Sequence, residues 1–580
     1  MAAFHRAFSL LRLTRTKDKL LSTFFSPVCK QSKSNHRRLL LCRSLSSTST
    51  PTDYDSAFAS ARDDPENFWA AAAENIEWMK KWDRVLDQSQ DPFTKCAPTV
   101  VVSANCGVEP SRTVPYKPLL DEALSLIEFK PKKCVIFNHT QFEPAQLHPG
   151  QDLDWHDAVA LGTPADCVPV PATDPVYILY TSGTTGVPKA IMRPSGGHAV
   201  ALAWSMWNIY GLKPGQVWWA ASDLGWVVGH SYITYAPLLA GCTTVLYEGK
   251  PVGTPDPGAF FRVLQQHKVN GMFTAPTALR AIRSEDADGT YAKKYLPLNQ
   301  FQSLFVAGEH CDQETMLWIQ GLLKSPILDN WWQTETGWAI TATCQGLGMD
   351  LYPAPGTTGK PVLGYNVQVL RPDGTETDDN ELGQVYVKLP LPPGNVSTLY
   401  KGDEHFKKTY FSTLEGYYDT MDAGVRNEKG YIAVLSRSDD VINVAGHRLS
   451  CGSLEEAVLE SSEIVDTAVI GVPDKLKGHV PLGICVVKQG SQMSEEEVRA
   501  DVIKTVRTEI GPVAAFKQVV FVPKLPKTRS GKVPRQTLAA LAAGKPFKIP
   551  MTIDDATVYP AIKESLQKLG YAPDIPEDSS

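Results

Sequence analysis

Short apolar runs alternate with longer stretches of helical spacing from about residue 175 onward. The runs VYILY, GMFTA, SLFVAG and SPILD have the length and residue types of strands. Upstream, CAPTVVVSAN (96–105) contains a similar β-branched run, and DDPENFWAAAAENIEWMKKWDRVL (63–86) predicts a helix with Pro65 near its start. Strands that alternate with helices predict an α/β fold built on parallel sheets.

The pattern changes near residue 437, where a smaller unit is expected to begin. VDTAVIGV and GHVPLGICVVK predict two of its strands. Ser494 and Glu497 have the spacing of a helix capping box. Val498, Val502, Val506 and Ile510 then follow at helical spacing until Gly511-Pro512 ends the helix.

Composition narrows the class of protein. The length of 580 residues predicts more than one domain, and 43% hydrophobic and 21% charged residues fit a soluble globular protein. The net charge of −6 argues against a general nucleic-acid binder. No apolar run approaches the roughly 20 residues of a membrane-spanning helix. The 11 cysteines include no CxxC pair and are interpreted as reduced thiols, each of them simply a packing residue.

The first 50 residues differ from the rest of the chain. They are basic and serine-rich, and Asp18 is their first acid. This composition favours a mitochondrial transit peptide over residues 1–48, and hence the mitochondrial matrix, above the alternative of a disordered basic tail.

The stretch YTSGTTGVPK (180–189) follows the strand VYILY directly. Glycines let the backbone turn tightly and bring N–H groups close to a ligand, and hydroxyls add donors, so a phosphate chain is the expected ligand. A Walker loop is excluded because Val187-Pro188 separate the second glycine from the lysine. Taken alone, the stretch fits an ordinary polar turn equally well.

Four further motifs follow this loop in order: DNWWQTETG (329–337), YDTMDAG (418–424), SRSDDVINVAGHRLS (436–450) and PKTRSGKVPR (526–535). With them the chain resembles the adenylate-forming, AMP-binding family, and WWAASDLGWVVGHSYITYAPLLAG (218–241) resembles its short-chain branch, the acetyl- and propionyl-CoA synthetases. The resemblance covers residues 50 to about 570.

The resemblance implies an α/β fold. It divides the chain into a helical segment of acetyl-CoA-synthetase type (50–95), a large N-terminal domain of parallel and mixed sheets with flanking helices (96–437), a small, mobile α+β C-terminal domain (438–550) and a tail (551–580). The implied reaction joins a short-chain acid to coenzyme A through an acyl-adenylate and releases AMP and pyrophosphate. ATP, Mg²⁺, coenzyme A and the acid are the implied small-molecule partners. Neither a nucleic acid nor a membrane span is expected, and the oligomeric state stays open.

The family's nucleotide site carries over residue by residue. Glu335 matches the Mg²⁺ ligand, Asp422 the carboxylate that accepts both ribose hydroxyls, and Lys532 the lysine that stabilises the transition state. Lys532, Thr181 and Glu335 are the implied catalytic residues. The implied nucleotide-binding set is Thr181, Ser182, Gly183, Thr184, Thr185, Gly186, Lys189, Gly308, Glu309, His310, Asp329, Trp331, Gln333, Thr334, Asp422, Arg437 and Arg448.

The acyl pocket and the coenzyme A site are implied in the same way. The pocket residues are Trp226, Val227, Val228, Ala307 and Trp332. Trp332 would close the pocket, and Ala307, where acetate-specific members usually have Val, favours propionate over acetate. Arg112 matches a contact to coenzyme A, whereas Glu109 stands where the family has a second arginine. Asp439 matches the hinge between the domains.

One departure from the family is large. Lys95 runs almost directly into the strand PTVVVSAN, where the family has on the order of ninety further residues, close to a small domain in size. Such a loss is expected to truncate the N-terminal subdomain and to expose apolar surface and strand edges. An active ligase and a catalytically impaired or non-catalytic variant therefore both remain open. A peptide-synthetase adenylation domain is a weaker third alternative.

Overall fold

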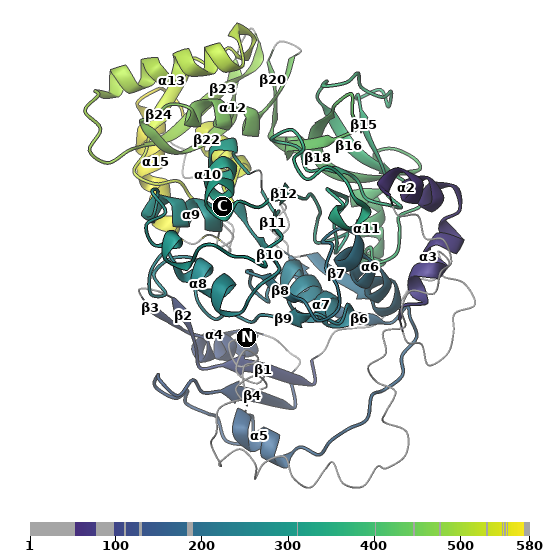
Figure 1. Cartoon of the computed structure of the whole chain (residues 1–580). Helices are drawn as coiled ribbons and strands as arrows, with labels where there is room; N and C mark the ends of the chain where they lie inside the picture. Colours follow the sequence, from purple (N-terminus) through teal and green to yellow (C-terminus); the bar gives the residue numbers. More distant parts are fainter. Residues whose placement is uncertain are drawn as a thin grey trace.

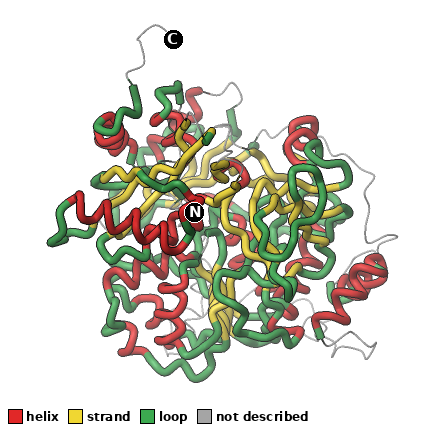
Figure 2. Tube along the Cα trace, turned by 90° about the horizontal axis from the view of Figure 1, so that it is seen from above, coloured by secondary structure: helices red, strands yellow, loops and turns green. Residues whose placement is uncertain are grey.

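The computed structural model describes residues 53–573, except 77–97, 110–111, 127–129, 182–188, 310, 401, 445–446, 475–476, 529–531, 548, 550–552 and 554. The fold is α/β, with strands gathered through the middle and helices on the outside (Figure 2). In Figure 1 the first sheet lies at the bottom, the larger sheets lie in the centre and at the right, and the C-terminal unit lies at the upper left.

Two helices open the described chain, α2 (Tyr54–Asp63) and α3 (Pro65–Ala73). Asp64 caps α3 by accepting from the N–H of Asn67, and Pro65 occupies its first turn, as the sequence predicted. The helix predicted over 63–86 is confirmed for this first part only, because its later part lies outside the described residues. Trp69 anchors α3 by packing edge-on against Trp204 and Trp338 of the main core.

A small parallel sheet follows, in the order β1-β4-β5, with one hairpin and two helices. The strand expected in CAPTVVVSAN is confirmed as β1. The elements are β1 (Val100–Ala104), β2 (Cys106–Glu109), β3 (Arg112–Pro115), α4 (Lys117–Leu126), β4 (Lys133–Phe137), β5 (Asp152–Asp154) and α5 (Trp155–Leu161). Its buried core cluster consists of Ala104 and Phe137, with Tyr116 and Trp155 packed against it.

The runs GMFTA, SLFVAG and SPILD form three neighbouring strands of a five-stranded parallel sheet, in the order β12-β11-β10-β8-β9. This confirms the predicted parallel architecture. The strands are β8 (Val217–Ala220), β9 (Thr243–Thr244), β10 (Gly271–Thr274), β11 (Ser303–Val306) and β12 (Ile327–Asp329). The helices around them are α7 (Ala236–Leu239), α8 (Ala259–Gln266), α9 (Pro276–Glu285) and α10 (Gln313–Leu323), with a π-helical turn over Gly229–Tyr235.

The strand VYILY is confirmed as part of β6 (Pro175–Thr181), but the expectation that it joins a parallel sheet is wrong. It pairs antiparallel with β7 (Lys189–Pro194), which pairs in turn with β17 (Thr398–Leu399). The physical reason is the short connection, since a parallel crossover needs a dozen or more residues and only 182–188 separate the two strands. Helix α6 (Ser195–Asn208) follows β7 and is almost wholly buried.

A second antiparallel sheet has the order β15-β16-β18-β19 and lies at the upper right in Figure 1. Its strands are β15 (Asn366–Leu370), β16 (Gly383–Lys388), β18 (Tyr417–Arg426) and β19 (Ile432–Arg437). Before this sheet the chain forms the short antiparallel pair β13 (Thr341–Ala342) and β14 (Lys360–Pro361). Helix α11 (Asp403–Tyr410) lies between β16 and β18 in the sequence.

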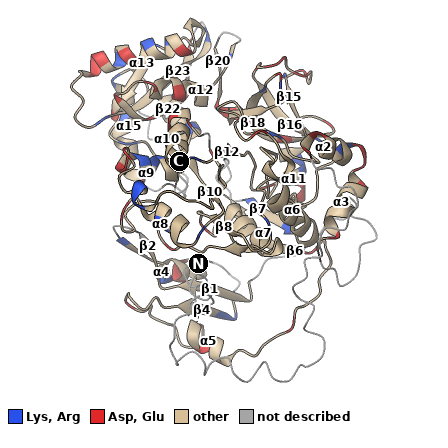
Figure 3. Ribbon diagram, in the orientation of Figure 1, with Lys and Arg blue, Asp and Glu red and all other residues tan. Residues whose placement is uncertain are grey.

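The C-terminal unit is a mixed sheet covered on both faces. Its strands are β20 (Val441–Val444), β21 (His447–Ser450), β22 (Ile464–Asp474), β23 (Gly478–Val487) and β24 (Gln518–Phe521). Its helices are α12 (Cys451–Leu459), α13 (Glu495–Glu509), α14 (Arg535–Ala542) and α15 (Tyr559–Gln567). The predicted capping box of α13 is confirmed, and Lys and Arg are interspersed with Asp and Glu along this helix (Figure 3).

Candidate functional site

The candidate site begins where the parallel sheet ends. Ala307 follows β11 and Asn330 follows β12, and the N–H of Asn330 donates to the carbonyl of Val306 at 2.9 Å. Carboxyl ends of adjacent parallel strands meet at one edge, which is where ligands bind in open α/β sheets. The motif DNWWQTETG therefore starts at this edge and runs on toward β18 and α11.

A buried carboxylate, Asp422 on β18, is the centre of the first cluster. Its Oδ2 accepts from Gln333 Nε2 at 2.6 Å and from Trp331 Nε1 at 3.2 Å, and its Oδ1 lies 3.4 Å from Arg437 Nη1. Burial raises the pKa of Asp422, and the charges of Arg437 and Lys532 and the two hydrogen bonds oppose that rise. Residues of the motifs that begin at 329, 418 and 436 therefore meet at the Asp422 carboxylate. The charge of Lys532, from the motif that begins at 526, also acts on this carboxylate.

A bulge in β18 positions Asp422. Val385 of β16 pairs with Asp422, but its neighbour Tyr386 pairs with Asp419, so Thr420 and Met421 have no partner in the ladder. Met421 adopts a positive φ of 56°, which side-chain-bearing residues seldom adopt. The Thr420 carbonyl, turned out of the ladder, accepts from Gln333 at 2.6 Å and from Arg437 at 3.3 Å. Such bulges recur next to active sites, where they redirect a side chain.

A second buried carboxylate, Glu335, lies in the same segment. Its Oε1 accepts from Lys189 Nζ at 3.1 Å and from the hydroxyl of Tyr410 on α11, and that hydroxyl lies 2.6 Å from Lys189 Nζ. Burial alone would raise the pKa of Glu335, but Lys189 and Tyr410 stabilise the carboxylate and hold its pKa below the usual range. Its Oε2 accepts no hydrogen bond from the described residues, so a hard oxygen donor remains at this point.

Thr181 and Lys189 are the two ends of the glycine-rich loop, and they pair across β6 and β7. Both ends therefore lie beside Glu335. The other loop residues of the predicted set, Ser182, Gly183, Thr184, Thr185 and Gly186, lie outside the described residues. Within the parts that the structure describes, no group of three or more His, Cys, Asp or Glu could hold a metal ion. A cation at Glu335 would consequently need oxygen from a substrate or water as well.

The predicted adenine segment lies directly after β11. Gly308 is exposed and has a φ of +100°, and His310 lies outside the described residues. The Glu309 carboxylate turns toward α9, where it accepts from the N–H of Thr277 at 2.7 Å and pairs with Arg280 at 2.6 Å. Its side chain therefore holds the segment in place and leaves the backbone available.

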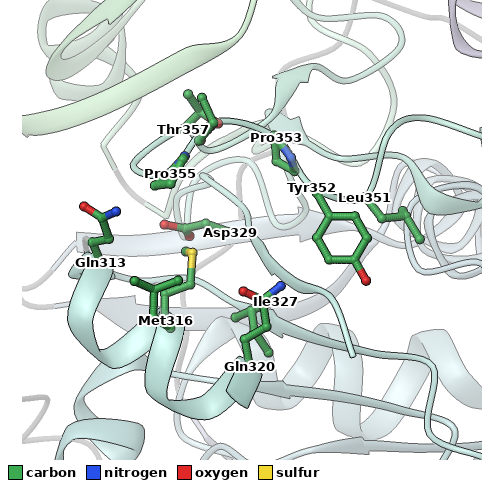
Figure 4. A pocket seen from close by; sticks show the side chains of 12 residues that line it. Gln313, Met316, Gln320, Ile327, Asp329, Leu351, Tyr352, Pro353, Pro355 and Thr357 are labelled. Atoms are coloured by element: carbon green, nitrogen blue, oxygen red, sulfur yellow. The ribbon is translucent and has the colours of Figure 1, made fainter. Parts of the chain in front are cut away.

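Asp329 projects into a pocket between α10 and the segment 351–357 (Figure 4). Gln313, Met316 and Gln320 of α10 form one wall, and the opposite wall is rich in proline. Asp329 is buried at the end of β12. The structure thus places it on the α10 side of the motif, whereas Trp331 and Gln333 turn toward Asp422.

The residues predicted to line the acyl pocket are buried or packed against the main core, except Trp226. Trp332 packs edge-on against Tyr232 and Phe273, at ring-centroid distances of 5.5 and 6.1 Å. Ala307 is 4% exposed and belongs to the same core cluster, Val228 packs against that cluster, and Val227 is also buried. Trp226, in contrast, is 43% exposed.

The remaining residues of the predicted set are Lys532, Arg448 and Asp439 near the C-terminus and Arg112 near the N-terminus. The Thr528 N–H donates to the Lys532 carbonyl at 2.8 Å, and the Lys532 N–H donates to the Thr528 hydroxyl at 3.1 Å. The charge of Arg448 on β21 opposes the rise that burial causes in the pKa of Tyr386 on β16. Asp439 lies 3.7 Å from Arg437 and accepts from Gln536, so it contacts residues on both sides of the boundary expected near residue 437. Arg112 is exposed in the β2–β3 hairpin, opposite Glu109 in the register and outside these clusters.

Two site residues were missed from the sequence. Tyr410 carried no signal, because a single tyrosine in a short amphipathic helix is an ordinary packing residue. Arg193 is fully buried and donates to the carbonyls of Thr334, Glu335 and Gly394. A signal existed for it, since a charged residue in the apolar run AIMR is unusual for a strand.

Three family models match the chain. The AMP-binding enzyme model matches residues 88–400, the AMP-binding enzyme C-terminal domain 453–532, and the acetyl-coenzyme A synthetase N-terminus 54–97. Among solved structures, acetoacetyl-CoA synthetase from Streptomyces lividans has a TM-score of 0.71 at 22% identity, covering 82% of this chain and 71% of that one. That similarity supports the fold.

Several curated relatives are closer in sequence. Acyl-CoA synthetase short-chain family member 3, mitochondrial, of Rattus norvegicus is 56% identical over 471 residues, 81% of this chain and 69% of the relative. The Homo sapiens protein of the same name is 45% identical over 637 residues, 91% of this chain and 93% of the relative. Propionate–CoA ligase of Salmonella typhimurium is 39% identical over 479 residues, covering 81% and 75%.

These alignments also reveal a gap. Ninety-one per cent of 580 residues is about 528, so about 109 of the 637 positions aligned with the human relative have no counterpart here. The 471-residue alignment with the rat relative corresponds to 81% of this chain and thus contains almost no gap. The missing positions therefore lie outside that block, in keeping with the internal segment that the sequence lacks.

Proposed function

The chain belongs to the AMP-binding enzyme family, in its branch of short-chain acyl-CoA synthetases, which are AMP-forming ligases; from this we propose that it ligates propionate to coenzyme A. The acid would first attack the α-phosphate of ATP and release pyrophosphate, and the thiol would then displace AMP from the acyl-adenylate. Acetate and butyrate would be poorer substrates. The proposal rests chiefly on the cluster at Asp422, where separate motifs converge on one buried carboxylate.

The nucleotide would bind across the two carboxylate clusters. Asp422 would accept the ribose hydroxyls, and Arg437 beside it would balance its charge and reach toward the phosphates. Trp331 and Gln333 hold that carboxylate in place. Gly308 and the neighbouring Glu309 and His310 would contact the adenine through the backbone, with Asp329 at the side of the base.

The phosphates would lie between the glycine-rich loop and Glu335. The hydroxyls and N–H groups from Thr181 to Gly186, together with Lys189, would hold the β- and γ-phosphates, and Thr334 would contact the α-phosphate. Glu335 suits Mg²⁺, because its Oε2 remains an available hard donor and Mg²⁺ usually takes one or two carboxylates plus phosphate oxygens. The metal would neutralise phosphate charge there.

Charge that develops at the α-phosphate would be stabilised by Lys532. The lysine already lies within electrostatic range of Asp422, and a cation aimed at developing charge is an effective form of catalysis. Arg448 would support the phosphates from the same domain. We further propose that Asp439 is the hinge about which residues 438–550 turn against 96–437 between the two half-reactions, with 50–95 and 551–580 flanking these domains.

The acid would lie against Trp332, with Ala307, Val227 and Val228 around it. The small Ala307 leaves room for about one carbon more than valine would, a difference of roughly 1–3 kcal/mol in favour of propionate. Trp226 would close the pocket only after turning inward. Arg112 would contact the nucleotide part of coenzyme A.

We place the protein in the mitochondrial matrix, with residues 1–48 as its transit peptide. The relatives at 45–56% identity carry mitochondrial names, and the basic, acid-poor first 48 residues have the expected composition. No helix in the described part of the chain has the length and apolarity to cross a membrane.

The decisive experiment is propionate-dependent ATP–pyrophosphate exchange by the purified chain without residues 1–48. Exchange that needs Mg²⁺ and is faster with propionate than with acetate would support the proposal. No exchange from soluble, folded protein would overturn it and favour the non-catalytic alternative, which the thin core of the β1–β4–β5 sheet makes a real competitor.

A further inference from the structure

Arg193 is a completely buried cation behind the phosphate side of the site. It lies on β7, four residues after Lys189, and none of its surface is exposed. Its Nη1 donates to the carbonyls of Glu335 at 2.9 Å and Gly394 at 2.5 Å, and its Nη2 donates to the carbonyl of Thr334. Its Nε lies 3.3 Å from the hydroxyl of Tyr177.

All four of these partners are neutral. No ion pair among the described residues involves Arg193, and the nearest titratable neighbour on α6, His198, is itself buried with neither ring nitrogen hydrogen-bonded. Burial, reinforced by the Arg193 charge, lowers the pKa of His198 well below its usual value and keeps this ring neutral. Within the described part of the chain the guanidinium thus has no counter-ion at ion-pair distance, and a buried charge without one is costly to keep.

The surrounding backbone is shaped for this side chain. Gly337 has a φ of +77°, and a Cβ there would lie 2.7 Å from the guanidinium carbon. The N–H of Val396 donates to the same Glu335 carbonyl at 2.8 Å, so the segment 394–396 is held together with the motif. One side chain therefore ties the strand after the glycine-rich loop to two other segments.

The bonds to Thr334 and Glu335 act on the catalytic side of the chain. A carbonyl and the following N–H lie on opposite sides of a planar peptide unit. A guanidinium that binds the Thr334 carbonyl therefore fixes the direction of the Glu335 N–H as well. Charge-assisted hydrogen bonds are about twice as strong as neutral ones, so this orientation is firmly held.

We propose that Arg193 is a positioning residue for MgATP: it fixes the Thr334–Glu335 backbone against β7, the strand that follows the glycine-rich loop in the sequence, and its charge attracts the phosphates. This rests on the proposed function for the identity of the ligand. The competing explanation is that Arg193 serves only the stability of the fold.

The test measures MgATP binding by calorimetry and ATP–pyrophosphate exchange, both with the full chain. Arg193→Met removes the charge and the hydrogen bonds. Arg193→Lys keeps the charge but loses the planar guanidinium, whose two terminal nitrogens donate to separate carbonyls. Loss of hydrogen bonds from a charged group predicts MgATP binding weaker by about 10-fold or more for Met, and a smaller loss for Lys. The KM for propionate should change by less than about 3-fold, because the acyl residues are not among the partners of Arg193.

Tyr177→Phe is the matched control, since it removes only the neutral contact and should leave MgATP binding unchanged. Unaltered MgATP affinity in folded Arg193→Met, or equal losses for ATP and propionate, would overturn the proposal. If the Met variant does not fold, the Lys variant decides by the same criterion. MgATP binding by the parent chain without exchange would sink the proposed function alone, whereas absence of MgATP binding by the parent would sink both.

Discussion

The scaffold around Glu335 and Asp422 and the β1–β4–β5 sheet differ greatly in the size of their buried cores. The scaffold belongs to a continuous core in which Trp69, Trp204 and Trp338 pack edge-on against one another. The sheet has Ala104 and Phe137 as its buried cluster. In the scaffold the carboxylates of Asp422 and Glu335 each have several partners, whereas Val100 and Val102 of β1 are 48% and 50% exposed.

The exposed apolar side chains are concentrated in one part of the chain. Ten of the exposed large apolar side chains lie between residues 100 and 180: Val100, Val102, Val108, Leu119, Val159, Leu161, Val168, Val170, Val176 and Tyr180. The expectation that a missing segment would expose apolar surface and strand edges stays a prediction, since only a contiguous apolar patch marks a surface that something normally covers. Local stability need not be uniform in one chain, so the two regions should respond differently to the same kind of change.

The largest effect is expected from Trp338→Ala in the scaffold. Trp338 is fully buried against Trp69, Trp204 and Tyr365, so its truncation leaves a large cavity. The free energy of unfolding should fall by about 3–5 kcal/mol. Urea unfolding followed by tryptophan fluorescence and by circular dichroism measures it. Trp338→Phe is the control and should cost much less, and a loss below about 1 kcal/mol for Ala would contradict a continuous core.

Lys532→Ala separates the two half-reactions. Adenylation should lose about 2.7–4 kcal/mol of transition-state stabilisation, a drop of 10²–10³-fold in pyrophosphate exchange. Formation of propionyl-CoA from supplied propionyl-adenylate should persist, because the lysine serves the first step. Both rates are measured on the same preparation. If both rates fall together, Lys532 has a role beyond adenylation, and the proposed assignment of this lysine to the first step is wrong.

Ala307→Val probes the fit of the acyl pocket. Two added methyl groups should shift the ratio of kcat/KM for acetate and propionate toward acetate by roughly 1–3 kcal/mol, or about 5–150-fold. Competition between the two acids in one reaction gives this ratio directly. Ala307→Gly, which adds no bulk, should not move it in that direction. An unchanged ratio in the valine variant would reject the pocket.

The smallest effect is expected from Val102→Thr in β1. The side chain is half exposed and the β-branched shape is retained, so the free energy of unfolding should change by less than about 0.5 kcal/mol. Hydrogen exchange read out by mass spectrometry should show β1 and β4 opening well before β10 and β11 in parent and variant alike. Protection of β1 equal to that of β10 would remove the contrast between the regions.

The sequence predicted much of this molecule because strand periodicity, helix caps and motif order are local signals. β1, β10, β11, β12 and the capping box of α13 were all confirmed. The antiparallel pairing of β6 with β7 was mispredicted, although the seven-residue connection excluded a parallel crossover. Tyr410 could not be predicted, since its contact with Glu335 joins residues 75 positions apart through tertiary packing. The thin core could be inferred only from the absence of residues between Lys95 and β1.

The bulge at Thr420 and Met421 has a consequence for insertions and deletions. Neighbouring residues of a strand face opposite sides of a sheet, so pairing has a parity. Two extra residues keep that parity, and the chain on both sides of the bulge stays in step with β16. Loss of one codon at Met421 would leave a single extra residue, so both parts of β18 could keep their faces only by forming a different bulge, in which two residues oppose one. Such a change would redirect the Thr420 carbonyl that Gln333 and Arg437 contact, so a change of length at this point of the gene acts directly on the site.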